Sequence, residues 1–181
     1  MKTEKNYDFR KKLLTPHQNN IRDYGIVCSD GETELSDGMA VVLPDNFGDV
    51  TLTAAKDLID YLFTSHNMSA MLTKKSKAVN NAVFLSVSKN LDDMAFKIEV
   101  SDVATLTGRD ERALAQAIYY LEDLMTIKKA PILQKKTTTK RPLFSPRMIH
   151  SGYGLDNYPD QHLSAIARSG MDAILVFTKG V

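Results

Sequence analysis

Residues 94–129 read MAFKIEVSDVATLTGRDERALAQAIYYLEDLMTIKK, and this stretch decides the fold of the chain. Phe96, Ile98 and Val100 alternate with charged residues, which is the period-two pattern of a half-buried strand. A second alternating run follows at 103–107, after only two intervening residues. The spacing predicts that the second strand returns beside the first as a hairpin.

The second half of the stretch predicts a helix that lies on a sheet. Gly108 stands where the backbone needs a positive φ or a close approach, and Asp110 is placed to cap the helix. Glu111 in the first turn and Lys128 with Lys129 in the last match the helix dipole. One wide apolar stripe is formed by Leu114, Ala117, Ile118, Leu121, Leu124 and Met125. These residues indicate scaffold rather than catalysis.

Four more strands and one more helix are predicted before this stretch. The strands come from short apolar or alternating runs at 24–28, 39–43, 70–73 and 82–87. The helix spans 49–67, has an apolar stripe at three- and four-residue spacing, and can be capped by Asp49, Thr51 or Thr53. The order ββαββββα predicts an α+β fold: a two-layer sandwich of a mixed sheet of four to six strands, with two helices on one face.

The composition is that of an ordinary globular protein and excludes several classes of function. Of 181 residues, 43% are hydrophobic and 25% charged, and the net charge of +1 gives no electrostatic case for nucleic acid or a membrane as partner. No apolar run is long enough to span a membrane, and no signal peptide is visible. The compartment stays open, because a secreted parent without its leader has the same appearance. The single cysteine, Cys28, excludes an internal disulfide and is expected to be buried.

The chain divides into four segments. Residues 1–23 are polar and predict a flexible or loosely docked lead-in, and 24–132 hold the sandwich. Residues 133–143 predict a linker, although the run QKKTTTKR is equally typical of an exposed strand edge. Residues 144–181 predict a strand at Arg147–His150, a loop, a helix beginning near Pro159 and closed by Gly170, and an apolar strand at 173–177.

The last predicted strand, AILVF, has the continuous apolar character of a strand buried on both faces in a parallel sheet. One β-α-β unit cannot bury both sides of such a strand unaided. Either it docks on the first domain, or the chain is the front part of a longer protein, and we expect the second.

The order of elements resembles the small α+β domain that precedes the barrel in family 20 glycoside hydrolases, the β-N-acetylhexosaminidases, and a related domain of the α-glucuronidases. The similarity rests on the strand–turn–strand, Gly108, and the helix with AQAIYYLEDLM. Phe144-Ser145-Pro146-Arg147 occupies the place of the family's aromatic-x-x-Arg sequence, which opens the first barrel strand. The family usually has Gly directly after that Arg, whereas this chain has Met148.

The resemblance implies a non-catalytic domain followed by the first β-α-β of a truncated (β/α)8 barrel. The family's catalytic acidic dyad then lies beyond residue 181, so this chain alone is expected to be inactive and its parent a glycosidase. The expected partners are the remainder of the barrel and, in the whole protein, carbohydrate. The alternative is a free-standing carbohydrate- or protein-binding module with no enzymatic role.

Four residues are candidates for substrate binding. Arg147 matches the family's arginine for sugar hydroxyls, and the alternative for it is a structural salt bridge or linker contact. His150, Tyr153 and Asp156 lie on the loop after the strand, where barrel enzymes place their sites, or else they have turn-forming or surface roles. We expect no cofactor. His17, His66 and His162 lack metal-ligand spacing, so no metal is expected either.

Overall fold

The structure is a computed structural model that describes residues 15–74, 80–150 and 158–176. The chain divides into two compact units. The first consists of residues 18–142, and the second contains, of the described residues, 15–17, 143–150 and 158–176.

The larger unit is built on a six-stranded mixed sheet. Across the sheet the strands run β3 (Ala70–Thr73), β2 (Met39–Val42), β4 (Ala82–Val87), β6 (Ala104–Gly108), β5 (Phe96–Val100) and β8 (Thr137–Lys140). The first four are parallel to one another, whereas β5 is antiparallel to both of its neighbours. The predicted hairpin is therefore confirmed, with Phe96 opposite Gly108 and Val100 opposite Ala104. A separate small sheet pairs β1 (Glu32–Glu34) with β7 (Ile132–Gln134).

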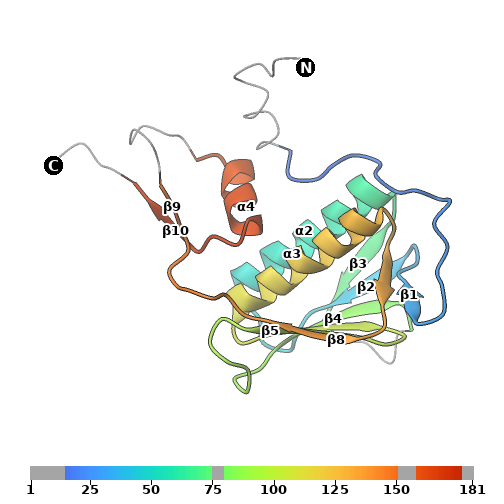
Figure 1. The fold of residues 1–181 in the computed structure, drawn as a ribbon, viewed down its shortest axis with the longest axis horizontal. Helices are drawn as coiled ribbons and strands as arrows, with labels where there is room; N and C mark the ends of the chain where they lie inside the picture. The colour runs from blue at the N-terminus through green and yellow to red at the C-terminus, as the bar shows by residue number, and fades with distance from the viewer. Residues whose placement is uncertain (1–14, 75–79, 151–157, 177–181) are drawn as a thin grey trace, which may run out of the picture. The chain divides into compact units, whose positions relative to one another are not determined.

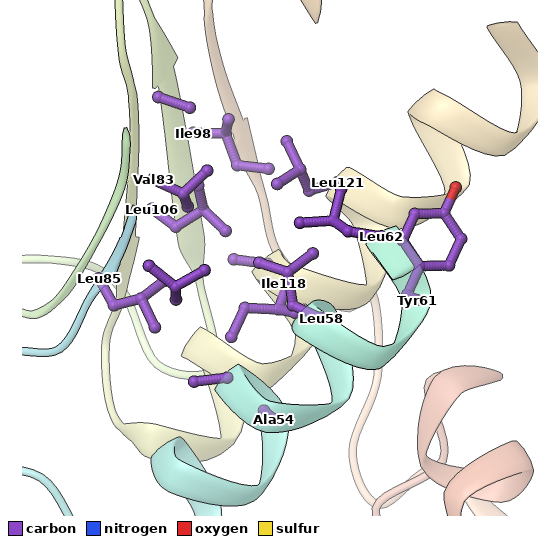
Figure 2. Close-up of a cluster of buried hydrophobic side chains, with 14 of the residues drawn as sticks. Ala54, Leu58, Tyr61, Leu62, Val83, Leu85, Ile98, Leu106, Ile118 and Leu121 are labelled. Carbon is purple, nitrogen blue, oxygen red and sulfur yellow. The ribbon is translucent and has the colours of Figure 1, made fainter. Parts of the chain in front are cut away.

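Two helices, α2 (Asp49–His66) and α3 (Glu111–Lys128), cover one face of this sheet, as expected (Figure 1). Strand alternation turns Val83 and Leu85 toward the helices, where they enter the main core. Figure 2 shows the centre of this core, with leucines of α2 and α3 meeting apolar side chains of three strands. The α+β sandwich with two helices on one face is what the apolar stripes predict.

The connection from β6 to α3 explains why residue 108 is glycine. A Cβ at this position would lie 2.6 Å from the carbonyl oxygen of Asp110 and still closer to the backbone nitrogen of Leu114. The close backbone approach is therefore what requires glycine, since Gly108 is not among the residues with positive φ. The predicted cap is confirmed, because Asp110 Oδ1 accepts a hydrogen bond from the Ala113 N–H at 2.9 Å.

The start of α2 is capped differently from the prediction. The N-cap residue is Gly48, and none of Asp49, Thr51 and Thr53 acts as the cap. Instead the carboxylate of Glu111, in the first turn of α3, accepts hydrogen bonds from the Gly48 N–H at 3.0 Å and the Thr51 N–H at 3.1 Å. It also accepts one from the Thr51 hydroxyl at 3.1 Å. A Cβ at residue 48 would lie 2.6 Å from Glu111 Oε1, so glycine leaves the space for this carboxylate.

Replacing Glu111 with Ala is expected to lower the free energy of unfolding by about 2 kcal/mol. The backbone N–H groups of Gly48 and Thr51, at the start of α2, then lose the charged group that accepts their hydrogen bonds. Glu111→Gln keeps one acceptor oxygen and is expected to cost about half as much. Urea unfolding followed by circular dichroism measures both. Arg112→Ala, at the exposed next residue, is the control, and an equal cost there contradicts the bridging role of Glu111.

The predicted strand at 24–28 is wrong. The Asp23 side chain accepts a hydrogen bond from the Gly25 N–H at 2.9 Å, and the Asp23 carbonyl accepts one from the Ile26 N–H at 3.2 Å. This turn competes successfully with the strand propensity of the residues that follow. The segment lies on the surface, so Cys28 is exposed rather than buried. The first strand of the unit is β1 instead.

Two segments expected to lie outside the sandwich are partly built into it. Residues 20–23 belong to the expected lead-in, yet the backbone N–H groups of Asn20, Ile21 and Asp23 donate to carbonyl oxygens at the ends of α2 and α3. Within the expected linker 133–143, Thr137–Lys140 forms β8 and pairs with β5 at the edge of the sheet. The second interpretation of that run, an exposed strand edge, is therefore the one that the structure supports.

The smaller unit holds the expected strand–helix–strand arrangement. β9 (Met148–His150) and β10 (Ala173–Leu175) are parallel, with Met148 opposite Ala173, and α4 (Asp160–Arg168) connects them. Gly170 follows α4 with a φ of 82°, which suits the predicted glycine at the helix end. The last strand is not buried on both faces in this chain: of its described residues, Ala173 and Ile174 are half-buried and Leu175 is exposed. This agrees with the expectation that one β-α-β unit cannot bury both sides of the strand unaided. The physical reason is that, in the described chain, β10 has β9 as its only neighbour.

Candidate functional site

The candidate site is the end of the smaller unit at which β9 finishes and α4 begins. His150 is the last residue of β9, is exposed, and lies opposite Leu175 of β10. The predicted substrate-binding residues Tyr153 and Asp156 lie outside the described residues. In parallel α/β units, the carboxyl ends of the strands and the loops that follow them form ligand sites. Of the four candidates, the structure therefore places His150 at the edge expected for a site.

Arg147 lies at the other end of β9, immediately before the strand begins. Its Nε donates to Asp172 Oδ2 at 3.2 Å, and its backbone N–H donates to Asp172 Oδ1 at 2.9 Å. In return the Asp172 N–H donates to the Arg147 carbonyl at 2.9 Å. Both side chains are largely buried, and Asp172 directly precedes β10. This reciprocal arrangement joins the starts of the two strands.

The contacts of Arg147 thus have the character of the structural salt bridge that the sequence analysis set beside the sugar-binding role. The bond from Arg147 Nε to Asp172 Oδ2 fixes the direction in which the largely buried guanidinium extends. The structure does not bring Arg147 to the same strand end as His150. Its role as a ligand for sugar hydroxyls stays a prediction.

An aromatic pair that was not predicted lies at the beginning of α4. The rings of Tyr158 and His162 stack with their centroids 5.4 Å apart and an angle of 28° between their planes. Tyr158 precedes Pro159, the N-cap of α4, and His162 lies in the first turn. Their spacing of four residues across a helix start was the available signal. In the sequence, His162 stands out only as a possible metal ligand, so the pairing was not predicted.

Other kinds of site find little support in the described part of the chain. Among residues 15–74, 80–150 and 158–176, no three His, Cys, Asp or Glu side chains are grouped so as to hold a metal ion. Over those same ranges, every helix is too short or too polar to cross a bilayer. Of the described residues, the His150 imidazole and the stacked pair of Tyr158 and His162 are those that offer chemistry near the strand end and the start of α4.

The sequence matches no family model, and no curated protein matches it. Solved structures, by contrast, match in fold. The chain superposes on the β-hexosaminidase of Streptomyces plicatus with a TM-score of 0.65 and 14% identity, over 81% of this chain and 31% of that one. For the family 20 exo-β-N-acetylglucosaminidase of Vibrio harveyi the TM-score is 0.57 at 14% identity. The match covers 89% of this chain and 25% of that one.

A family 115 4-O-methyl-α-glucuronidase with specificity for decorated arabinogalactans is also similar. Its TM-score is 0.60 at 14% identity, over 80% of this chain and 25% of that one. The resemblance that the order of elements indicates is therefore confirmed at the level of fold. This chain spans between a quarter and a third of the length of these three proteins, and it has the fold of a segment that glycoside hydrolases contain.

Proposed function

We propose that this chain is the non-catalytic N-terminal part of a glycoside hydrolase, which braces a carbohydrate-cleaving barrel. Residues 18–142 form the bracing domain, and β9, α4 and β10 are the first unit of the (β/α)8 barrel. The partners are then the remaining units of the barrel and, in the whole protein, carbohydrate. The acidic residues that the resemblance assigns to catalysis lie beyond residue 181.

The parallel pairing of β9 with β10 carries this proposal. Parallel strands are normally covered on both faces by helices and flanked by further strands. Here Leu175 is 43% exposed and Val176 is 51% exposed, and Met148 and Leu163 are exposed as well. Further β/α units packed around this pair would remove that apolar surface from water. The fold likeness to glycoside hydrolases supports the choice of a carbohydrate-cleaving barrel for these units.

Within the proposal, the strand end that carries His150 faces the substrate. Tyr153 and Asp156 follow it in sequence, and the stacked pair of Tyr158 and His162 begins the next helix. Such side chains offer hydrogen bonds to sugar hydroxyls and an aromatic surface. Arg147 would then act from the opposite strand end, by holding β9 and β10 in register through Asp172.

Limited proteolysis with mass readout of fragments tests the proposal. Because β10 has β9 as its only neighbouring strand in the described part of the chain, we expect cleavage first within residues 143–176, followed by a stable fragment ending near residue 142. The same preparation is expected to show no turnover of aryl N-acetylglucosaminides. If residues 143–176 are protected as well as α3, the smaller unit is complete and the chain is a free-standing binding module instead.

A matched pair of variants sharpens the test. Val176→Ser removes apolar surface from the proposed barrel strand, and Val27→Ser removes a valine of the larger unit that is more exposed still, 83% against 51%. We expect only Val176→Ser to reduce concentration-dependent association in sedimentation velocity. Equal behaviour of the two variants would count against an unfinished barrel.

A further inference from the structure

Residues 20–23, which we call the strap, cross the ends of both helices of the larger unit. The Asn20 N–H binds the Thr64 carbonyl at 3.0 Å, and the Ile21 N–H binds the Ser65 carbonyl at 2.9 Å. At the end of α3, the Asp23 N–H binds the Lys129 carbonyl at 2.8 Å. Carbonyls in the last turn of a helix lack partners within the helix, so the strap supplies donors to groups that would otherwise need water.

A buried polar network lies in the same turn of α2. His66 is 0% exposed, and its Nε2 is 3.0 Å from the Tyr61 hydroxyl, with the two rings edge to face. The same hydroxyl lies 2.9 Å from the Glu122 main-chain carbonyl and 2.7 Å from Thr126 Oγ1, both on α3. The network therefore joins α2 to α3 close to the carbonyls that the strap binds.

The hydrogen bonds of the Tyr61 hydroxyl determine the tautomer of His66. A hydroxyl has one proton to donate, and a carbonyl oxygen can only accept, so Tyr61 donates to Glu122. The other two partners must then donate to Tyr61, and His66 does so through a protonated Nε2. In neutral His66 the remaining nitrogen, Nδ1, consequently carries a lone pair. Nδ1 is buried and has no hydrogen-bond partner among the described residues.

Protonating Nδ1 conflicts with its surroundings. The new N–H finds no acceptor in the described part of the network, and the imidazolium is buried with the positive charge of Arg22 acting on it. Arg22 belongs to the strap, and its Nη2 is paired with Glu34 Oε1 of β1 at 2.8 Å. The other ionisable residues of the network are Tyr61 on α2 and Glu122 on α3. Consistent with this, burial first and Arg22 second lower the pKa of His66 from 6.5 to about 4.

We propose that the strap is an acid-sensitive latch: a second proton on His66 opens residues 20–23 from the ends of α2 and α3 while the sheet and both helices stay folded. Opening lets water reach the imidazolium and separates it from the guanidinium of Arg22. The strap is held by three backbone hydrogen bonds and the ion pair of Arg22 with Glu34, and it is only half-buried at Ile21 and Arg22, so it can open without unfolding of the sheet or the helices.

The direction of the pH dependence follows from proton linkage. The closed state binds the proton with a pKa of about 4, whereas a solvated histidine binds it near 6.5. The open state therefore takes up more protons in this window, and the ratio of open to closed strap rises by up to about tenfold per pH unit as the pH falls from 6.5 toward 4. Above pH 6.5 the ratio is constant.

Hydrogen exchange of single amides, measured by NMR on the whole chain and corrected for intrinsic rates, tests the latch. Protection of the amides of Asn20, Ile21 and Asp23 is expected to fall by up to about tenfold per pH unit between pH 6.5 and 4.5. Protection of the core amides of Leu85 and Leu106 is expected to stay unchanged. If strap amides keep their protection, or lose it only together with the core amides, the latch is overturned.

Two variants identify the residue responsible. His66→Gln is expected to make strap protection independent of pH between 6.5 and 4.5, because glutamine does not titrate. His162→Gln, in the smaller unit, is the matched control and is expected to leave the pH dependence intact. If His66→Gln retains the dependence, another group drives the opening and the proposal is wrong. Should His66→Gln fail to fold, the exchange pattern of the unchanged chain decides alone.

Discussion

The Gly108→Ala variant is expected to lose more than about 3 kcal/mol of unfolding free energy, and to accumulate poorly as a folded protein. The added methyl group would meet backbone atoms of Asp110 and Leu114 rather than the end of a flexible side chain. Backbone at this point cannot shift without moving β6 or the start of α3, and both elements contribute to the core. Urea unfolding monitored by circular dichroism measures the loss.

Gly31→Ala is the matched control for this prediction. Gly31 has a φ of 82°, and an added Cβ finds no atom within 4 Å, so the substitution introduces backbone strain without a clash. We expect it to cost about 1 kcal/mol. A loss at Gly108 no greater than that at Gly31 would show that the close approach between β6 and α3 relaxes easily.

Ile118→Ala is expected to lower the unfolding free energy by about 2–5 kcal/mol. Ile118 is 0% exposed and lies at the centre of the cluster in Figure 2, between the leucines of α2 and the strands. Removing three carbon atoms leaves a cavity in the core that the neighbouring side chains fill only in part. The midpoint of urea denaturation is expected to fall, with an unchanged slope.

The same helix provides a matched control for the core substitution. Ile127 is 81% exposed, so Ile127→Ala removes the same atoms from water rather than from the core. We expect a change within about 0.5 kcal/mol. Similar costs for the two substitutions would mean that α3 is not oriented on the sheet as described.

Local patterns in this sequence were sufficient to predict most of the sandwich. The hairpin of β5 and β6 follows from alternation of apolar residues, and α3 follows from its apolar stripe and from Asp110. These features depend on interactions between residues a few positions apart, so they can be predicted from the local sequence. The strand predicted at 24–28 failed for a local reason too, because the turn made by Asp23 was not recognised.

The features that escaped prediction depend on partners far apart in sequence. The cap of α2 comes from Glu111, and the partner of Arg147 is Asp172, 25 residues away. Neither position is marked by a pattern around it. The candidate site was located only as far as the strand end at His150, because a loop that follows a strand has no periodicity from which its side-chain positions can be deduced. Tyr153 and Asp156 therefore remain sequence-based candidates.

The bond between Glu111 and Gly48 affects when α2 can form while the chain is being synthesised. The two groups that it joins are separated by 63 residues. When the chain leaves the ribosome from its N-terminus, the segment of α2 therefore appears well before its acceptor does. Until then the backbone N–H groups at the start of α2 can donate hydrogen bonds only to water, and an isolated helix of this length is only marginally stable in water. Residues 49–66 are thus expected to become a lasting helix only once α3 has emerged, so the two helices are completed in a single event.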